Sequence, residues 1–498
     1  MKGFLLTIVA ILFAFPLWSA DMIPESQFVL EKNESPLIAF RITFLTGSAH
    51  DPAGKEGVAT LTASLLSEGA TTKNKYEQIL KLLFPMAAGY SSQVDKEMTV
   101  FIGVVHKDHL NPYYELLRDS ILSPGLKQED FDRLKADQLN YVAKTLRFNN
   151  DEELGKEALN WAIFQGHPYG RPDEGTVTGI QSLTLQDVKD FYKNQYTRRN
   201  LVIGIAGDYP ETLIEKLRQD FSKLAAGSDA ARPLPPAPKI EGVRVVIVEK
   251  KTPGTAFSFG YPVPFTRSDP DYYPMLVMNS WLGQHRTQVG RLYNVMRGAR
   301  GMNYGDYSYI EHFALGGNFM QPPPNFSRHQ QIFEVWIRPV PNAIRHFALR
   351  QAIREVQMLG ERGLSREGLE TMRDFQLNYM VSLAQSNSEM LGYSVDDHFY
   401  KLPQSYFDLT KSKLESLTLD QLNTAIRKYV STQNMVIAVV TEGAEEFKKA
   451  LISNAPSPMQ YDSPKPEAIL QEDKIIMNYP LAIKADNITI IPADKIFE

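Results

Sequence analysis

An arginine and a tyrosine seven residues apart form the most specific pair of chemical groups in the sequence. Arg297 and Tyr304 lie in "GRLYNVMRGARGMNYGDYSYIE", where an apolar helical stripe ends at "RGARG" and a strand-like run follows with Tyr304 near its start. A guanidinium and a phenol that converge across this turn would suit a peptide carbonyl or a developing oxyanion. The residue types alone favour a structural alternative, in which the arginine meets a helix dipole and the tyrosine is half buried in the strand.

Other common forms of catalytic chemistry find little support in the residues. The nine histidines include one closely spaced pair, His106 and His109, with no Glu or Cys nearby in the sequence, and we expect a solvent-facing turn there. The chain contains no Cys, which excludes thiol nucleophiles and thiolate metal sites. No G-x-S-x-G elbow and no phosphate-binding glycine loop are present in the sequence.

One predicted helix stands out because it carries no reactive group. In "GVATLTASLLSEGA", residues 57–70, apolar residues recur at helical spacing, and the remaining positions of the first turns are small or hydroxylic. None of these groups binds a metal tightly, holds a proton near neutral pH or attacks a carbonyl. This helix nevertheless follows directly after the glycine-rich loop "GSAHDPAGKEG".

The elements that would position these residues are duplicated. "SLTLQDVKDFYKNQYTRRNLVIGIAGD" from Ser182 corresponds to "SLTLDQLNTAIRKYVSTQNMVIAVVTE" from Ser416, and each reads as a capped amphipathic helix followed by a buried strand. A second pair of segments shares the letters Q-L-N-Y, at Gln138 and Gln376. Two recurrences in the same order and at nearly the same spacing predict two homologous domains. We predict an α+β fold, each domain being a largely antiparallel sheet with helices packed on one face.

The domain boundaries follow from the repeat and from changes in composition. We expect a first domain over residues 21–224, an extended Ala- and Pro-rich linker over 225–239 and a second domain over 240–451. The extension 452–498 should wrap over the second domain. The Pro-rich stretch that begins at Met320, "MQPPPNFSRH", is interpreted as an inserted loop that could line an entrance, and the residues favour the alternative of a surface loop with no role.

The charge and the first residues indicate where the protein acts. The net charge of -5 and the pI of about 6.1 provide no field that would attract nucleic acid. Residues 1–20 have the layout of a secretory signal peptide, with an uncleaved anchor as the alternative, and no later stretch is expected to span a membrane. We therefore expect an exported protein of the bacterial periplasm.

These motifs together resemble the pitrilysin/insulinase family of zinc peptidases, in particular the short-chain branch that includes mitochondrial processing peptidase. The resemblance covers nearly the whole mature chain, from "GSAHDPAGKEGVATLTASLLSEGA" through "FQGHPYGRPDEGTVTGIQSLTLQDV" to "GRLYNVMRGARGMNYGDYSY". Active members carry H-x-x-E-H in the first of these motifs. Thr60, Ala63 and Ser64 occupy the positions of the two histidines and the glutamate, and Asp137 is the only acid where the third ligand, a Glu, is expected.

The resemblance also changes the interpretation of Arg297 and Tyr304. Family members use an arginine and a tyrosine at this spacing to hold the substrate and stabilise the transition state, and in two-chain members the chain without zinc can supply them. The resemblance therefore implies that this chain is the non-zinc subunit of an exported heterodimeric zinc metallopeptidase. It implies no cofactor bound by this chain, zinc in a homologous partner subunit, and a peptide or an unfolded polypeptide as substrate.

Two alternatives belong to other functional classes. The chain could be a proteolytically inactive scaffold of a larger assembly, a role that some family members have. It could also be an independent enzyme with relocated metal ligands, in which case the purified chain would contain stoichiometric zinc.

Overall fold

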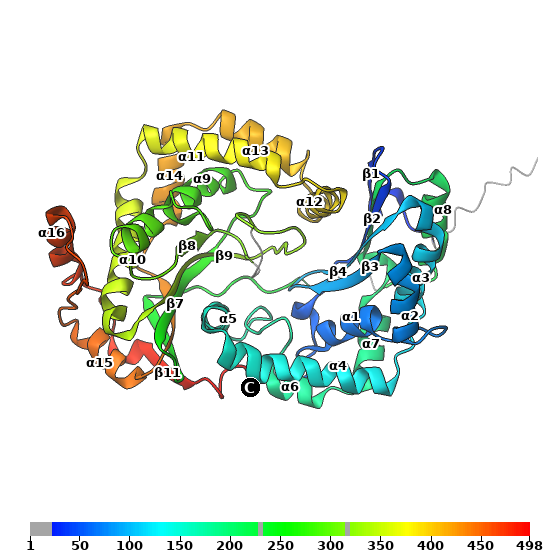
Figure 1. The fold of residues 1–498 in the computed structure, drawn as a ribbon, viewed down its shortest axis with the longest axis horizontal. Coiled ribbons are helices and arrows are strands. Elements are labelled where there is room, and N and C mark those ends of the chain that lie inside the picture. The colour runs from blue at the N-terminus through cyan, green and yellow to red at the C-terminus, as the bar shows by residue number, and fades with distance from the viewer. Residues whose placement is uncertain (1–21, 228–232, 314–318) are drawn as a thin grey trace, which may run out of the picture.

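The computed structural model describes residues 22–227, 233–313 and 319–498. The predicted signal peptide and residues 228–232 of the predicted linker lie outside this range. Figure 1 shows two sheets, each with its own group of helices, at opposite ends of the molecule. No helix among the described residues is long and apolar enough to cross a membrane.

The first sheet has five strands, of which β1 pairs parallel with β5 and the others pair antiparallel. In spatial order the strands are β1 (Phe28–Lys32), β5 (Leu201–Gly207), β2 (Leu37–Phe44), β4 (Thr99–His106) and β3 (Gly89–Val94). All seven residues of β5 are buried, as expected for a strand of continuous apolar sequence that is covered on both faces.

The second sheet has six strands and repeats the order and the directions of the first. In spatial order they are β11 (Ile488–Pro492), β6 (Val243–Glu249), β10 (Met435–Thr441), β7 (Gly254–Val263), β9 (Gln331–Pro341) and β8 (Asp306–Tyr309). The run from β6 to β8 corresponds strand by strand to the run from β1 to β3, and β11 from the C-terminal extension adds one parallel strand outside β6. The predicted α+β class with duplicated halves is confirmed.

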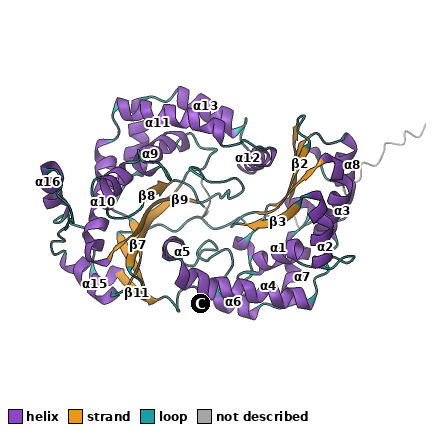
Figure 2. Ribbon diagram, viewed as in Figure 1, coloured by secondary structure: helices purple, strands orange, loops and turns teal. Residues whose placement is uncertain are grey.

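Helices occupy most of the remaining sequence (Figure 2). In the first half they are α1 (Val58–Glu68), α2 (Tyr76–Leu83), α3 (Leu110–Leu122), α4 (Gln128–Asn140), α5 (Asp151–Ile163), α6 (Val177–Ser182), α7 (Leu185–Gln195) and α8 (Glu211–Phe221). In the second half they are α9 (Tyr272–Gly283), α10 (Arg345–Arg362), α11 (Arg366–Tyr379), α12 (Asn387–Tyr400), α13 (Tyr406–Glu415), α14 (Leu419–Tyr429), α15 (Ala444–Ser453) and α16 (Glu467–Ile476). The repeat is visible in the caps: Thr184 before α7 and Thr418 before α14 each accept a bond from the backbone N–H three residues later.

The two halves exchange one helix each. Helix α5 packs on β10 and β7 of the second sheet, and α12 packs on β1, β2 and β5 of the first (Figure 1). Small side chains on the first sheet make room for α12. Leu391 of α12 lies in one buried cluster with Ala39 and Ala206. Each sheet therefore has its own helices on one face and a helix from the other half on the opposite face.

The Pro-rich stretch that was expected to be a surface loop is instead largely buried between the halves. Arg328 is 3% exposed and donates from Nε to Asp95 Oδ2 of the first half at 2.7 Å. Asn325 is fully buried and accepts from Arg41 Nη1 of β2 at 2.5 Å. The surface prediction was wrong because the polar residues of this stretch find their partners on the other half of the chain.

Candidate functional site

Arg297 and Tyr304 lie together in the structure. The guanidinium carbon of Arg297 is 5.3 Å from the centre of the Tyr304 ring, a cation–π contact. Tyr304 is 77% exposed, although large aromatic side chains are usually covered. Within the described residues, neither the guanidinium nor the phenol hydroxyl forms a hydrogen bond or an ion pair with another side chain or with the backbone. Among the described residues, both groups therefore keep their hydrogen-bonding capacity unused.

The segment that carries the pair folds as a π-helix, η7 (Tyr293–Gly298), followed by a tight turn. Buried Val295 and Met296 anchor the helix, and Gly301 takes a left-handed conformation with φ of +67° so that the chain can reverse. The predicted apolar stripe ending at "RGARG" is confirmed. The predicted strand begins later than expected, because Tyr304 lies in a bend before β8 and the first strand residue is Asp306. Single-turn π-helices are frequent at functional sites.

Hydrogen bonds of the Asn303 side chain fix the turn on the side of Tyr304. The Asn303 amide donates to Asp306 Oδ1 at 2.6 Å and to the Arg338 carbonyl at 2.9 Å, and it accepts from the Gly305 N–H at 3.2 Å. Asp306 is fully buried, and burial raises the pKa of its carboxyl to about 8. The other oxygen of Asp306 has no hydrogen-bond partner among the described residues.

Helix α1, at the positions of the H-x-x-E-H motif, contains no metal ligand. The Thr60 hydroxyl donates to the Asp173 carbonyl at 2.6 Å, Ala63 is buried, and Ser64 is half-buried. A zinc site needs imidazole, carboxylate or thiolate donors, so these residues do not fit the metal. Across the described residues, no group of three or more His, Cys, Asp or Glu is arranged to hold a metal ion.

The loop before α1 has a structural task that the sequence analysis missed. Asp51 is 7% exposed and accepts from the N–H groups of Gly57 at 2.6 Å and Ala59 at 2.9 Å, so that it caps the helix. Gly57 itself has φ of +104°, a conformation that other residues rarely adopt. Burial raises the pKa of the Asp51 carboxyl to about 7. Asp51 lies well before the N-cap position Gly57, so the usual capping spacing could not have signalled this role.

The position on α4 where the third ligand is expected also offers no glutamate. Asp137, the only acid in this part of α4, is exposed, whereas its neighbour Gln138 is buried and faces the start of α1. The Gln138 amide donates to the carbonyls of Gly57 at 2.9 Å and Glu174 at 2.6 Å. This side chain therefore ties α4 to the α1 loop, a role that the shared Q-L-N-Y letters did not indicate.

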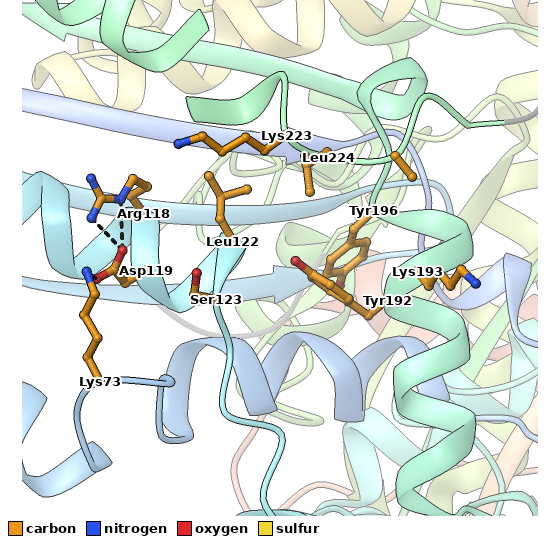
Figure 3. Close-up of a pocket in the computed structure, with 11 residues that line it drawn as sticks. Lys73, Arg118, Asp119, Leu122, Ser123, Tyr192, Lys193, Tyr196, Lys223 and Leu224 are labelled. Carbon is orange, nitrogen blue, oxygen red and sulfur yellow. Dashed lines mark hydrogen bonds and ion pairs between the residues drawn. The ribbon is translucent and has the colours of Figure 1, made fainter. Parts of the chain in front are cut away.

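A cavity of about 460 Å³ lies apart from both motifs, between α3, α7 and the chain after α8 (Figure 3). Its charged groups are mainly paired with each other: Asp119 accepts from Lys73 Nζ at 2.7 Å and from Arg118 Nη2 at 2.6 Å. The Tyr192 hydroxyl donates to the Ile121 carbonyl at 2.8 Å. None of the residues singled out by the sequence lines this cavity.

Comparison with known proteins decides the family. The model of the insulinase family, peptidase family M16, matches residues 27–177, and the model of the peptidase M16 inactive domain matches residues 182–373. The chain belongs to this peptidase family. The resemblance drawn from the motifs is confirmed, and Arg297 and Tyr304 fall within the part that matches the inactive domain.

Relatives in this family are distant. An uncharacterized zinc protease of Streptomyces coelicolor is 27% identical over 286 residues, which cover 56% of this chain and 61% of that protein. A mitochondrial-processing peptidase subunit beta of Dictyostelium discoideum is 22% identical over 246 residues, which cover 48% of this chain and 51% of that protein. The chain thus spans less than two thirds of the length of these relatives.

Solved structures share the fold over more of the chain. A peptidase M16 inactive domain from Pseudomonas fluorescens superposes with a TM-score of 0.73 at 21% identity, covering 83% of this chain and 95% of that one. A protease from Helicobacter pylori superposes with a TM-score of 0.71 at 17% identity, covering 83% of this chain and 96% of that one. At these identities the likeness shows the fold alone.

Proposed function

We propose that this chain is the non-zinc subunit of an exported heterodimeric metallopeptidase and supplies Arg297 and Tyr304 to the active site of a homologous zinc-binding partner. The observation that carries the proposal is the contact of 5.3 Å between these two side chains, which lie on a firmly held segment and form no hydrogen bond or ion pair within the described residues. The absence of fitting ligands at Thr60, Ala63 and Ser64 is consistent with zinc being held elsewhere.

The chemistry follows from the two groups. Zinc in the partner would activate the attacking water. The Arg297 guanidinium, with five N–H donors, would orient the carbonyl of the scissile peptide. The Tyr304 hydroxyl would donate a hydrogen bond to the oxygen that becomes negative as the carbonyl carbon turns tetrahedral. The substrate class is a peptide or an unfolded polypeptide.

Isolation of the native complex is the first experiment. Affinity purification of the tagged full chain from its own host, followed by mass spectrometry, should recover a companion chain that carries H-x-x-E-H. Metal analysis of the separated chains should place zinc in that companion. Recovery of an assembly without such a companion would refute the proposal and would favour a scaffold role. Stoichiometric zinc in this chain, with peptide hydrolysis by the chain alone, would also refute it.

The second experiment tests the two side chains in the isolated complex. Tyr304→Phe should lower kcat on a fluorogenic peptide by about 10²-fold or more, the usual loss for one oxyanion donor. Because Tyr304 is exposed and its hydroxyl has no hydrogen-bond partner among the described residues, and because Phe keeps the ring that Arg297 contacts, the melting temperature should not change. Tyr293→Phe is the matched control, since it removes a hydroxyl from the same π-helical segment. Normal turnover by the Tyr304→Phe complex would show that the assigned role is wrong.

A further inference from the structure

The C-terminal extension is attached to the turn between Arg297 and Tyr304. Arg300, with a fully buried side chain, donates from Nε to Asp473 and from Nη2 to Glu472, each at 2.8 Å, and both carboxylates belong to α16. Its Nη1 donates back to the Val295 carbonyl of the π-helix at 2.9 Å. A single guanidinium therefore joins the extension to the segment that carries Arg297.

Two further contacts strengthen this attachment. The Lys465 ammonium, from the chain just before α16, donates to the Ala299 carbonyl at 3.0 Å. The Tyr461 hydroxyl donates to the second oxygen of Asp473 at 2.7 Å, so that both oxygens of this carboxylate are occupied. The pairing with Glu472 and Asp473 raises the pKa of the Arg300 guanidinium above its ordinary value, against the effect of burial, and keeps it charged.

The opposite end of the segment is held by the same network. Arg291, just before the π-helix, donates to Glu355 Oε2 of α10 at 2.7 Å. Arg354 then links Glu355 at 3.2 Å to Glu472 at 3.0 Å. Buried or half-buried ion pairs thus bracket the segment at residues 291 and 300. Between them, the Arg297 guanidinium contacts the Tyr304 ring and forms no ion pair with any described residue.

We infer that the α16 carboxylates Glu472 and Asp473 are positioning residues, which hold the Arg297–Tyr304 segment in the geometry that a substrate carbonyl requires. The inference rests on the function proposed above for Arg297 and Tyr304. The guanidinium of Arg297 lies at the end of a long flexible side chain, so the direction of this group depends on where the π-helix and the turn are fixed. A displacement of about 1 Å in such a group can cost up to about 10²-fold in rate.

The test replaces both carboxylates by amides of the same size, Glu472→Gln with Asp473→Asn, in the full chain. Glu467→Gln is the matched control, because Glu467 lies on the exposed side of the same helix and, among the described residues, its side chain accepts a hydrogen bond from Gln471 alone. Hydrogen exchange of the amides in residues 293–302 should become at least tenfold faster in the double variant and stay unchanged in the control. Unchanged exchange in the double variant would overturn the inference, whatever the complex does catalytically.

Turnover by the reconstituted complex separates positioning from general stability. The double variant should lower kcat/KM about tenfold or more, and this loss should become smaller when Arg297 is already replaced by Ala, because part of it acts through that group. Faster exchange together with normal turnover in Arg297→Ala would refute the proposed function and leave the attachment intact. Faster exchange and a loss in Arg297→Ala, but none in the double variant, would overturn the positioning role.

A milder variant keeps the test decisive if the double variant fails to fold. Lys465→Met removes one hydrogen bond to the Ala299 carbonyl and leaves Arg300 paired with α16. It should accelerate exchange in residues 293–302 by a smaller factor, and no acceleration at all would count against the inference.

Discussion

Replacement of the buried Asp306 by Asn should remove one component of the pH dependence of stability. Burial raises the pKa of this carboxyl from 3.8 to about 8, so between these values the folded protein holds a proton that the unfolded chain has released. Unfolding then releases this proton, and the free energy of unfolding falls as the pH rises. One such group contributes about 1.4 kcal/mol per pH unit, or about 2.7 kcal/mol between pH 5 and pH 7.

The amide variant suits this measurement because it preserves the local bonding. The oxygen that accepts from Asn303 remains, and the new NH₂ takes the place of an oxygen that has no partner within the described residues. Urea unfolding at pH 5, 6 and 7, followed by tryptophan fluorescence, reports on this sheet because Trp336 packs against Tyr307 next to Asp306.

The informative quantity is the difference in unfolding free energy between the native protein and Asp306→Asn at each pH. Other carboxyls whose pKa is raised, such as Asp51 and Glu153, titrate in both proteins and cancel in this difference. The native protein should lose about 2.7 kcal/mol relative to the variant from pH 5 to pH 7. A difference that stays constant with pH would refute the assignment of a protonated Asp306.

Three other predictions, on the helix caps, on an ion pair between the halves and on the core between them, are tested by denaturant unfolding. Thr184→Ala and Thr418→Ala should each cost about 1 kcal/mol, because the two hydroxyls cap equivalent helices at the same distance of 3.3 Å; very unequal costs would contradict that equivalence. Arg328→Met should lower the free energy of unfolding by about 3–5 kcal/mol, because Asp95 stays buried without its arginine. Adding Asp95→Asn should recover much of this loss, and no recovery would argue against a charge effect. Phe497→Ala should cost about 3–5 kcal/mol, since this C-terminal side chain is 3% exposed in the core between the halves, and a neutral change would show that the C-terminus is not needed there.

Much of the fold could be predicted because the same helix–strand unit occurs twice in the sequence. The caps at Thr184 and Thr418, followed by seven-residue apolar strands, indicated equivalent helix–strand units, and the strand orders of the two sheets bear this out. The sequence could not indicate the exchange of α5 and α12. An amphipathic pattern shows that a helix has an apolar face, but not which sheet receives that face.

The candidate site was predictable in its residue types and only partly in its geometry. The spacing of Arg297 and Tyr304 across a turn allowed the two side chains to converge, and the residue types alone favoured a structural alternative. In the structure the two side chains are in contact, although Tyr304 lies before the strand and the helix is of the π type. The attachment through Arg300 was not foreseen, because its carboxylate partners lie about 170 residues later in the chain, in a segment whose position the sequence does not determine. Long-range ion pairs leave no local periodicity.

The lack of hydrogen-bond partners at half-buried Arg297 and exposed Tyr304 among the described residues would by itself be weak evidence of function, since water satisfies polar groups on any protein surface. What distinguishes this segment is the contrast with its surroundings. The side chains of Arg291, Arg300 and Asn303 are each engaged in hydrogen bonds or ion pairs within the protein. A freely solvated arginine needs no such frame, whereas a group that must meet a substrate carbonyl with sub-ångström accuracy does. The polar groups at α1 differ in this respect, because Asp51 and Thr60 form hydrogen bonds that hold the helix itself in place. Among the described residues, Arg297 and Tyr304 therefore combine donors that have no hydrogen-bond partner with a firmly held backbone, and the H-x-x-E-H positions of α1 offer no such combination.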